Sequence, residues 1–100
     1  MNQAAHQLLG LAMRARKVSS GEDTVLRDVR AGRAFLVLMA EDASKNTEKK
    51  LTDKCNSYNV PLIVTSTREH LGHAIGKDAR VVLAITDQKL SAKLKQLLNE

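Results

Sequence analysis

The stretch LGHAIGKDAR, residues 71–80, contains the residues that first suggest a chemical role. Two glycines followed by a lysine and an apolar run are reminiscent of a phosphate-binding loop. Such a loop needs four residues between its glycines and a serine or threonine after the lysine. Here three residues separate Gly72 from Gly76, and Asp78 follows Lys77. Because a carboxylate there would repel phosphate, the stretch does not predict a nucleotide-binding loop.

The other residues that could support catalysis or bind a metal do not form a set. Cys55, the only cysteine, falls on the apolar stripe of a predicted helix and is expected to be a buried packing residue. His70 and His73 could share a helical face, but a metal site needs further ligands. Glu41 and Asp42 follow a buried strand, where catalytic acids could lie, although a solvated turn is favoured. We predict no enzyme activity, no cofactor and no metal site.

The composition favours a polyanionic partner. The formal net charge is +5 and the pI is about 9.7, and basic domains commonly bind nucleic acid. A generic soluble protein with excess lysine is the alternative. The chain has one phenylalanine, one tyrosine and no tryptophan. This scarcity of aromatic residues excludes a sheet that binds single-stranded RNA by stacking bases on its face.

The sequence carries no signal for export or membrane insertion. Polar residues Asn2, Gln3, His6 and Gln7 interrupt the N-terminus, so no signal peptide is expected. No apolar run approaches the roughly 20 residues that span a membrane. A single cysteine excludes an internal disulfide and fits a reducing compartment. We therefore expect a cytoplasmic protein without a membrane partner. We also expect a monomer, because no exposed apolar face suggests self-association.

The apolar periodicity predicts alternating helices and strands in one domain over residues 1–100. Helices are expected over 2–16, 22–31, about 45–58, about 67–74 and a final segment after residue 87. Strands are expected at 18–19, 34–40, 61–65 and 80–86. The runs at 34–40 and 80–86 are continuously apolar, which is typical of strands buried on both faces. This order predicts an α/β fold whose central sheet is covered by helices on both faces.

Local signals predict where these helices begin. Ser44 is expected to cap the helix over 45–58. Ser66, with Glu69 three residues later, forms a capping-box signature for the short fourth helix. Thr86 or Asp87 is expected to cap the last helix.

Glycines and apolar spacing predict the helix ends and buried faces. Gly32 should end the second helix, and Gly72 or Gly76 the fourth. The buried stripe of the helix over 45–58 is predicted to comprise Thr47, Leu51, Cys55 and Tyr58.

Basic side chains gather at the ends of predicted elements. Cations near a helix C-terminus are favoured by the helix dipole, so several of these could be ordinary solvated charges. They are Arg14, Arg16 and Lys17 at the end of the first helix, Arg27, Arg30 and Arg33 on or after the second, and Lys77 and Arg80 beside the glycines.

The start of the second helix, SSGEDTVLR, is the most informative stretch. Acids in a first turn suit the helix dipole. The free N–H groups of a helix N-terminus also suit a phosphate or a base edge. Arg27 follows one turn later. Asp23 and Thr24 could form hydrogen bonds with base edges exposed in a distorted RNA.

Four stretches of the chain resemble a known family. They are LGLAMRARKVSSGEDTVLRDVRAG, LVLMAEDAS, TDKCNSYNVPLIV and LGHAIGKDARVVLAITD. Together they resemble the small RNA-binding ribosomal proteins of the L-seven-Ae and L-thirty-e superfamily, and more closely its bacterial YlxQ-type members. The resemblance runs from about Leu8 to Asp87. It implies a three-layer α-β-α sandwich with a small mixed sheet, here of four strands.

The resemblance also implies a site. The family binds kink-turn RNA, a sharply bent helix with tandem sheared G·A pairs, through a motif of Gly, any residue, Asn, Glu, two residues and Lys. Gly21 and Arg27 match its first and last positions, whereas Asp23 and Thr24 stand for Asn and Glu. A loop before the last strand contacts flipped-out nucleotides, with an apolar contact expected from Ile75. The complete set of expected RNA-binding residues is Lys17, Ser20, Gly21, Glu22, Asp23, Thr24, Arg27, Ile75, Gly76, Lys77 and Asp78.

The expected function is therefore non-catalytic recognition of structured, kink-turn-like RNA, with ribosomal RNA and the ribosome as expected partners. The replacement of Asn and Glu by Asp23 and Thr24 leaves an alternative open. In that alternative, the chain keeps the fold as a protein-interaction scaffold with weak or lost RNA affinity.

Overall fold

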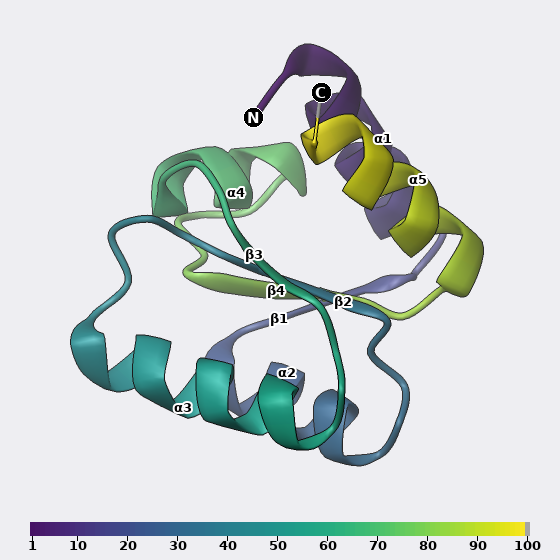
Figure 1. Ribbon diagram of the computed structural model, residues 1–100. Helices are drawn as coiled ribbons and strands as arrows, with labels where there is room; N and C mark the ends of the chain where they lie inside the picture. Colours follow the sequence, from purple (N-terminus) through teal and green to yellow (C-terminus); the bar gives the residue numbers. More distant parts are fainter. Residues whose placement is uncertain (100) are drawn as a thin grey trace.

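The computed structural model describes residues 1–99 and shows helices and strands in the predicted alternating order (Figure 1). Within these residues there are five helices and four strands. The helices are α1 (Gln3–Arg14), α2 (Glu22–Arg30), α3 (Lys45–Ser57), α4 (Arg68–Ala74) and α5 (Gln88–Leu98). The strands are β1 (Val18–Ser20), β2 (Leu36–Met39), β3 (Leu62–Val64) and β4 (Val82–Ile85).

The four strands form one mixed sheet in the order β1-β4-β2-β3. Strands β2 and β3 are parallel, joined by a crossover through α3, and Val37 is paired with Leu62. Strand β4 is antiparallel to both of its neighbours, with Leu83 opposite Ser20 on one side and Leu38 on the other. The predicted mixed sheet is confirmed.

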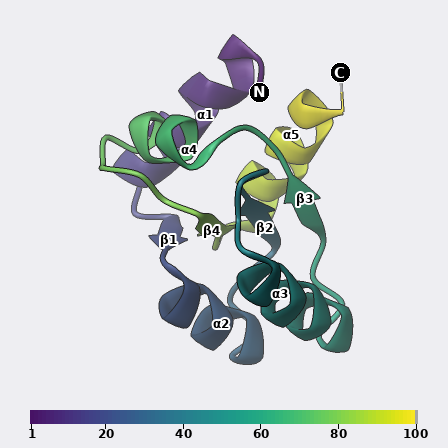
Figure 2. The ribbon, with the colours of Figure 1, turned by 90° about the vertical axis from the view of Figure 1, so that its left-hand side faces the viewer.

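Helices cover both faces of the sheet. Helices α1, α4 and α5 lie on one face and α2 and α3 on the other, as both views of the ribbon show (Figures 1 and 2). The two central strands, β2 and β4, are completely buried, which explains why their sequences are continuously apolar. The expected three-layer α-β-α sandwich is therefore confirmed.

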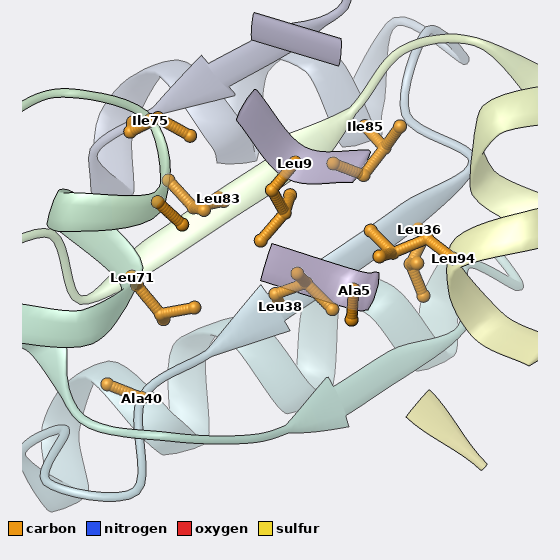
Figure 3. Close-up of a cluster of buried hydrophobic side chains, with 11 residues drawn as sticks. Ala5, Leu9, Leu36, Leu38, Ala40, Leu71, Ile75, Leu83, Ile85 and Leu94 are labelled. Carbon is orange, nitrogen blue, oxygen red and sulfur yellow. The ribbon is translucent and has the colours of Figure 1, made fainter. Parts of the chain in front are cut away.

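Successive residues of the central strands contribute to two separate cores. Leu36, Leu38, Leu83 and Ile85 point to the α1, α4 and α5 side, where they pack with Leu9 and neighbouring residues (Figure 3). The residues between them, Val37, Met39, Val82 and Ala84, pack against α2 and α3. This alternation follows from the two-residue period of a strand. It fixes the position of the sheet against both helical layers.

Two of the three N-cap predictions are confirmed and one is wrong. Ser44 accepts a hydrogen bond from the Thr47 amide, and Asp87 accepts one from the Leu90 amide. Helix α4 is capped by Thr67, not by Ser66. Ser66 has a φ of +63° and Thr67 has the extended backbone of an N-cap, so the helix begins one residue later than the capping-box signature suggested.

The predicted buried stripe of α3 is correct only in its centre. Leu51 and Cys55 are buried, and Thr47 is half-buried. Tyr58 is 47% exposed because the helix ends at Ser57 and Tyr58 forms its C-cap. A side chain beyond the last helical turn no longer follows the helical period.

Candidate nucleic-acid interface

The end of β1 and the start of β4 are joined at one end of the sheet. The backbone N–H of Gly21, directly after β1, donates a hydrogen bond to the carbonyl oxygen of Val82 at 3.1 Å. Ser20 is paired with Leu83 in the ladder between the two strands. This end faces the viewer in Figure 2. The entrance to α2 therefore lies beside the segment that leads from α4 into β4.

Gly21 has a backbone conformation that only glycine adopts easily. Its φ is +94° and its ψ is 147°. A Cβ atom added there would meet no atom within 4 Å, so the glycine is required by its dihedral angles and not by crowding. The backbone at this point is open to a close approach from outside.

The N-terminus of α2 is open. Of the helices in residues 1–99, α2 is the one without a side-chain cap: Asn2, Ser44, Thr67 and Asp87 cap the others, whereas Gly21 has no side chain to do so. The Val25 amide makes the first intrahelical bond of α2, to the Gly21 carbonyl. The amides of residues 22–24 precede this bond. Such amides carry the positive end of the helix dipole and bind phosphate or base acceptors.

Charged side chains surround this N-terminus. Asp23 and Arg27 are exposed, and Thr24 is half-exposed. Glu22 forms an ion pair with Lys50 of α3, with 3.5 Å between Nζ and Oε2. Among the described residues, Arg27 has no carboxylate within ion-pair distance, so its guanidinium is available to a ligand.

The loop between α4 and β4 is held against α4 by two glycines. Gly76 has a φ of +71°, which ends the helical path. Gly72 lies inside α4, and an added Cβ would be 1.9 Å from the carbonyl oxygen of Asp78. The Lys77 amide donates to the Gly72 carbonyl at 2.8 Å. The prediction that one glycine ends the helix is confirmed for Gly76, whereas Gly72 permits close contact between helix and loop.

This loop exposes charged residues but not the expected apolar one. Gly76, Lys77 and Asp78 are exposed, as expected. Ile75 is only 5% exposed and packs in the core beneath α4 (Figure 3). Its side chain therefore does not provide the apolar RNA contact expected from the sequence. The exposed apolar residue of the loop is Ala79.

Lys17 lies away from the other residues that the sequence predicted to bind RNA. It precedes β1, and its carbonyl accepts a hydrogen bond from the Thr86 amide, directly after β4. Because β1 and β4 are antiparallel, Lys17 lies at the opposite end of the sheet from Gly21. Gly21 and the first turn of α2 thus lie at the same end of the sheet as the segment that runs from residue 76 into β4, and Lys17 lies at the opposite end.

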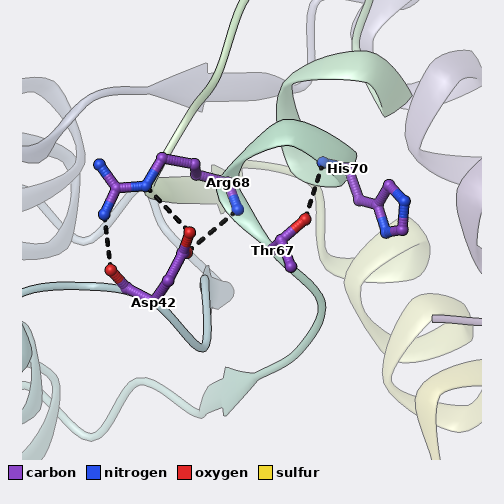
Figure 4. A network of polar contacts seen from close by, with 4 residues as sticks. All are labelled: Asp42, Thr67, Arg68 and His70. Atoms are coloured by element: carbon purple, nitrogen blue, oxygen red, sulfur yellow. Dashed lines mark hydrogen bonds and ion pairs between the residues drawn. The ribbon is translucent and has the colours of Figure 1, made fainter.

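An ion pair that the sequence did not indicate fixes α4 beside this surface. Arg68 binds Asp42 three times: through Nε to Oδ2 at 3.1 Å, through its backbone N–H to Oδ1 at 3.1 Å, and through Nη2 to the Asp42 carbonyl at 2.6 Å (Figure 4). The Arg68 carbonyl then accepts the Arg80 amide at 2.9 Å. Asp42, predicted to lie in a solvated turn, therefore anchors α4, and α4 anchors the end of the loop.

The pKa of Asp42 reflects this anchoring. Desolvation alone would raise the pKa, but the hydrogen bonds and the charge of Arg68 outweigh it and lower the pKa below its ordinary value of 3.8. The carboxyl is thus held in its ionised form.

The remaining candidate residues for chemistry are accounted for by packing and surface contacts. Cys55 is buried, as predicted, and desolvation raises the pKa of its thiol to about 11. His6 of α1 and His73 of α4 lie 3.2 Å apart between Nε2 and Nδ1, and His70 contacts the Ser66 hydroxyl at 3.0 Å. Within residues 1–99 there is no cluster of three or more potential metal ligands.

Comparison with known proteins identifies the family. Residues 3–95 match the family described as "Ribosomal protein L7Ae/L30e/S12e/Gadd45 family". The chain belongs to this family. It is also 60% identical over 92 residues to "RNA-binding protein YlxQ" of Bacillus subtilis (strain 168), an alignment that covers 92% of each chain.

Solved structures share the fold of this family member. A protein with unknown function from Bacillus halodurans C has a TM-score of 0.96 and 44% identity, covering 99% of this chain and 100% of that one. The "Giardia lamblia 15.5kD RNA binding protein" has a TM-score of 0.81 at 21% identity, covering 99% and 91%, which shows similarity of fold. None of the helices in residues 1–99 combines the length and apolar character needed to cross a membrane.

Proposed function

We propose that this protein binds structured RNA and recognises a kink-turn through the α2–loop surface, defined as Gly21, Glu22, Asp23, Thr24, Arg27 and residues 76–79. Family membership and a relative whose name is RNA-binding protein YlxQ support RNA binding. The observation that carries the finer proposal is the hydrogen bond between the Gly21 amide and the Val82 carbonyl. It brings the open N-terminus of α2 beside the loop that precedes β4.

Each part of the surface has a role in this proposal. Gly21 permits close approach of an RNA backbone or base edge, and the amides of the first turn of α2 offer donors. The carboxylate of Asp23 and the hydroxyl of Thr24 accept hydrogen bonds from base amino groups exposed in a kinked RNA. Arg27 contacts phosphate from one turn further along α2.

The loop completes the contact from the other side. Lys77 is exposed and supplies a second phosphate contact. Ala79 replaces Ile75 as the apolar contact for an unstacked base. Asp42 and Arg68 keep the loop in place, because the Arg80 amide is bonded to the Arg68 carbonyl.

The local charges explain why recognition would depend on RNA shape. Glu22, Asp23 and Asp78 place carboxylates among the cations of this surface, although Lys50 offsets Glu22. A uniform phosphate backbone would therefore gain little here from electrostatic attraction alone. A kinked RNA gains more because it presents base donors to the carboxylates and phosphates to Arg27 and Lys77.

The natural partner in this proposal is a structured cellular RNA, with ribosomal RNA as the first candidate because the family is one of ribosomal proteins. The protein would act as a monomer in the cytoplasm, in transient or stable association with the ribosome. Binding requires neither a cofactor nor a metal ion from the protein.

The experiment that tests the proposal compares Arg27→Ala and Lys77→Ala with Lys93→Ala, an exposed lysine on α5. The first two variants should each weaken kink-turn binding. Each should also reduce the slope of log affinity against log salt concentration by the amount expected for about one lost phosphate contact. Lys93→Ala should bind like the wild type. Unchanged binding in both test variants would contradict the proposed surface.

A further inference from the structure

The end of the sheet opposite Gly21 is strongly basic. Three connecting segments meet there, from α1 to β1, from α2 to β2 and from β4 to α5, on the right-hand side of Figure 1. The Lys17 carbonyl accepts the Thr86 amide at 2.8 Å, and the Phe35 amide donates to the Ile85 carbonyl at 2.9 Å. The basic end comprises five exposed cations that lie in these segments or on the adjoining helix ends: Arg16, Lys17, Arg30, Arg33 and Lys89.

Few carboxylates neutralise this cluster. Within residues 1–99, Asp28 pairs with Arg33 at 3.0 Å, and Asp87 accepts the Leu90 amide as the cap of α5. No ion-pair partner lies near Arg16, Lys17, Arg30 or Lys89 among these residues. The basic end therefore has a higher density of uncompensated positive charge than the α2–loop surface, where carboxylates and cations alternate.

The positions of Arg16 and Lys89 are not explained by helix stability. Arg16 follows the C-terminus of α1 with a φ of +61°, a position where glycine is the usual residue and a side chain is strained. Lys89 lies in the first turn of α5, where the helix dipole disfavours a cation. By contrast, the dipole does favour Arg30 at the end of α2. Two of the five cations, Arg16 and Lys89, thus occupy positions that the local backbone conformation or the helix dipole disfavours.

We propose that the basic end is a second RNA-binding surface that contacts the phosphate backbone of a duplex without reading its sequence. A cluster of uncompensated cations fits the regular spacing of duplex phosphates. Phe35, 39% exposed beside the cluster, adds one aromatic face, too few for a platform that stacks successive bases. With the α2–loop surface at the other end of the strands, the protein would hold two RNA segments, or two arms of one RNA, on opposite sides.

The test uses an uninterrupted RNA duplex as the probe. The triple variant Arg16→Gln, Lys17→Gln, Lys89→Gln should bind it several-fold more weakly than wild type. The slope of its log binding constant against log salt concentration, measured between about 50 and about 200 mM, should become shallower. The change should correspond to the loss of roughly two to three phosphate contacts. The matched control, Lys45→Gln, Lys49→Gln, Lys54→Gln on α3, removes the same charge and should have little effect. The double variant Lys17→Gln, Lys89→Gln leaves the strained position intact and should show an intermediate loss.

Equal weakening by the test and control variants would overturn the proposal, because only net charge would then matter. The proposal would also be overturned if polyglutamate competed for the basic end as strongly as the duplex does, a result that would favour an acidic protein partner. The ratio of kink-turn to duplex affinity separates this inference from the proposed function. A wild-type ratio near one would contradict kink-turn recognition and leave the duplex result standing.

Discussion

The Gly21 amide and the Val82 carbonyl oxygen are joined by a hydrogen bond of 3.1 Å, although the two residues are 61 positions apart in the sequence. This bond continues the β1–β4 ladder by one residue and sets where α2 begins relative to the loop before β4. Neither segment alone is a distinctive binding site. Their joint position gives one surface with helix amides, three charged side chains of α2 and a loop that carries Lys77 and Asp78.

Replacing Gly72 should disturb this surface from within. The Cβ of Gly72→Ala would overlap the Asp78 carbonyl oxygen at 1.9 Å, so the loop must move or α4 must shift. We expect a loss of about 1–3 kcal/mol in the free energy of unfolding, as for other overpacked sites. Kink-turn affinity should fall as well, because Lys77 and Asp78 move with the loop. Urea unfolding and RNA titration of the same variant measure both effects.

Gly21 should be sensitive for a different reason. Gly21→Ala meets no steric obstacle, but its φ of +94° strains any other residue, and we expect a loss of about 1–3 kcal/mol in unfolding free energy. Gly10→Ala is the matched control, because Gly10 is in the middle of α1 and its added Cβ would be 3.4 Å from the nearest atom. That control should be neutral or stabilising by up to about 1 kcal/mol. Equal losses in the two variants would refute the dihedral explanation.

The Asp42–Arg68 anchor should produce a pH-dependent effect. The pKa of this carboxyl is lower in the folded protein than in the unfolded chain, so the ionised carboxyl stabilises the fold when the pH is above the unfolded-state pKa. This stabilisation is lost as the pH falls through the folded-state pKa. The wild type should therefore have a higher thermal midpoint than Asp42→Asn at neutral pH. The difference should shrink once the pH drops below the ordinary value of 3.8. A difference that stays constant over this range would show that the charge of Asp42 is not responsible.

The two departures from the family motif can be tested by restoring it. Asp23→Asn removes a negative charge beside the RNA and adds an amide donor, and Thr24→Glu adds a longer acceptor for guanine amino groups. The double variant should bind a kink-turn more tightly, by about tenfold, which corresponds to about 1.4 kcal/mol. Glu22→Gln is a control that changes a charge in the same turn without restoring the motif. Tighter binding by Glu22→Gln alone would indicate a simple effect of charge.

The fold was largely predictable because its signals are local. The continuous apolar runs of β2 and β4, the caps Ser44 and Asp87, and Gly76 at the end of α4 are all readable within a few residues. For the last helix the sequence left Thr86 and Asp87 open as caps, and for α4 the capping-box signature selected Ser66, the residue before the true cap Thr67. Only the backbone angles decide such a case.

The site was predictable only in part because its geometry depends on distant contacts. An apolar residue after a helix can point inward or outward, and packing beneath α4 decides the case of Ile75. Lys17 is close to Gly21 in sequence, but the extended strand between them carries it to the other end of the sheet. The Asp42–Arg68 pair joins residues 26 positions apart, and no local pattern marks it.

The most direct test of the proposed function is a titration of the purified protein into a labelled kink-turn hairpin, beside the same hairpin with its G·A pairs replaced by Watson–Crick pairs, at two salt concentrations. We predict clear preference for the kinked RNA, with a preference ratio that changes little with salt because base contacts supply it. Equal affinity for both hairpins, with a steep salt dependence, would contradict kink-turn recognition and favour a scaffold that has retained the family fold.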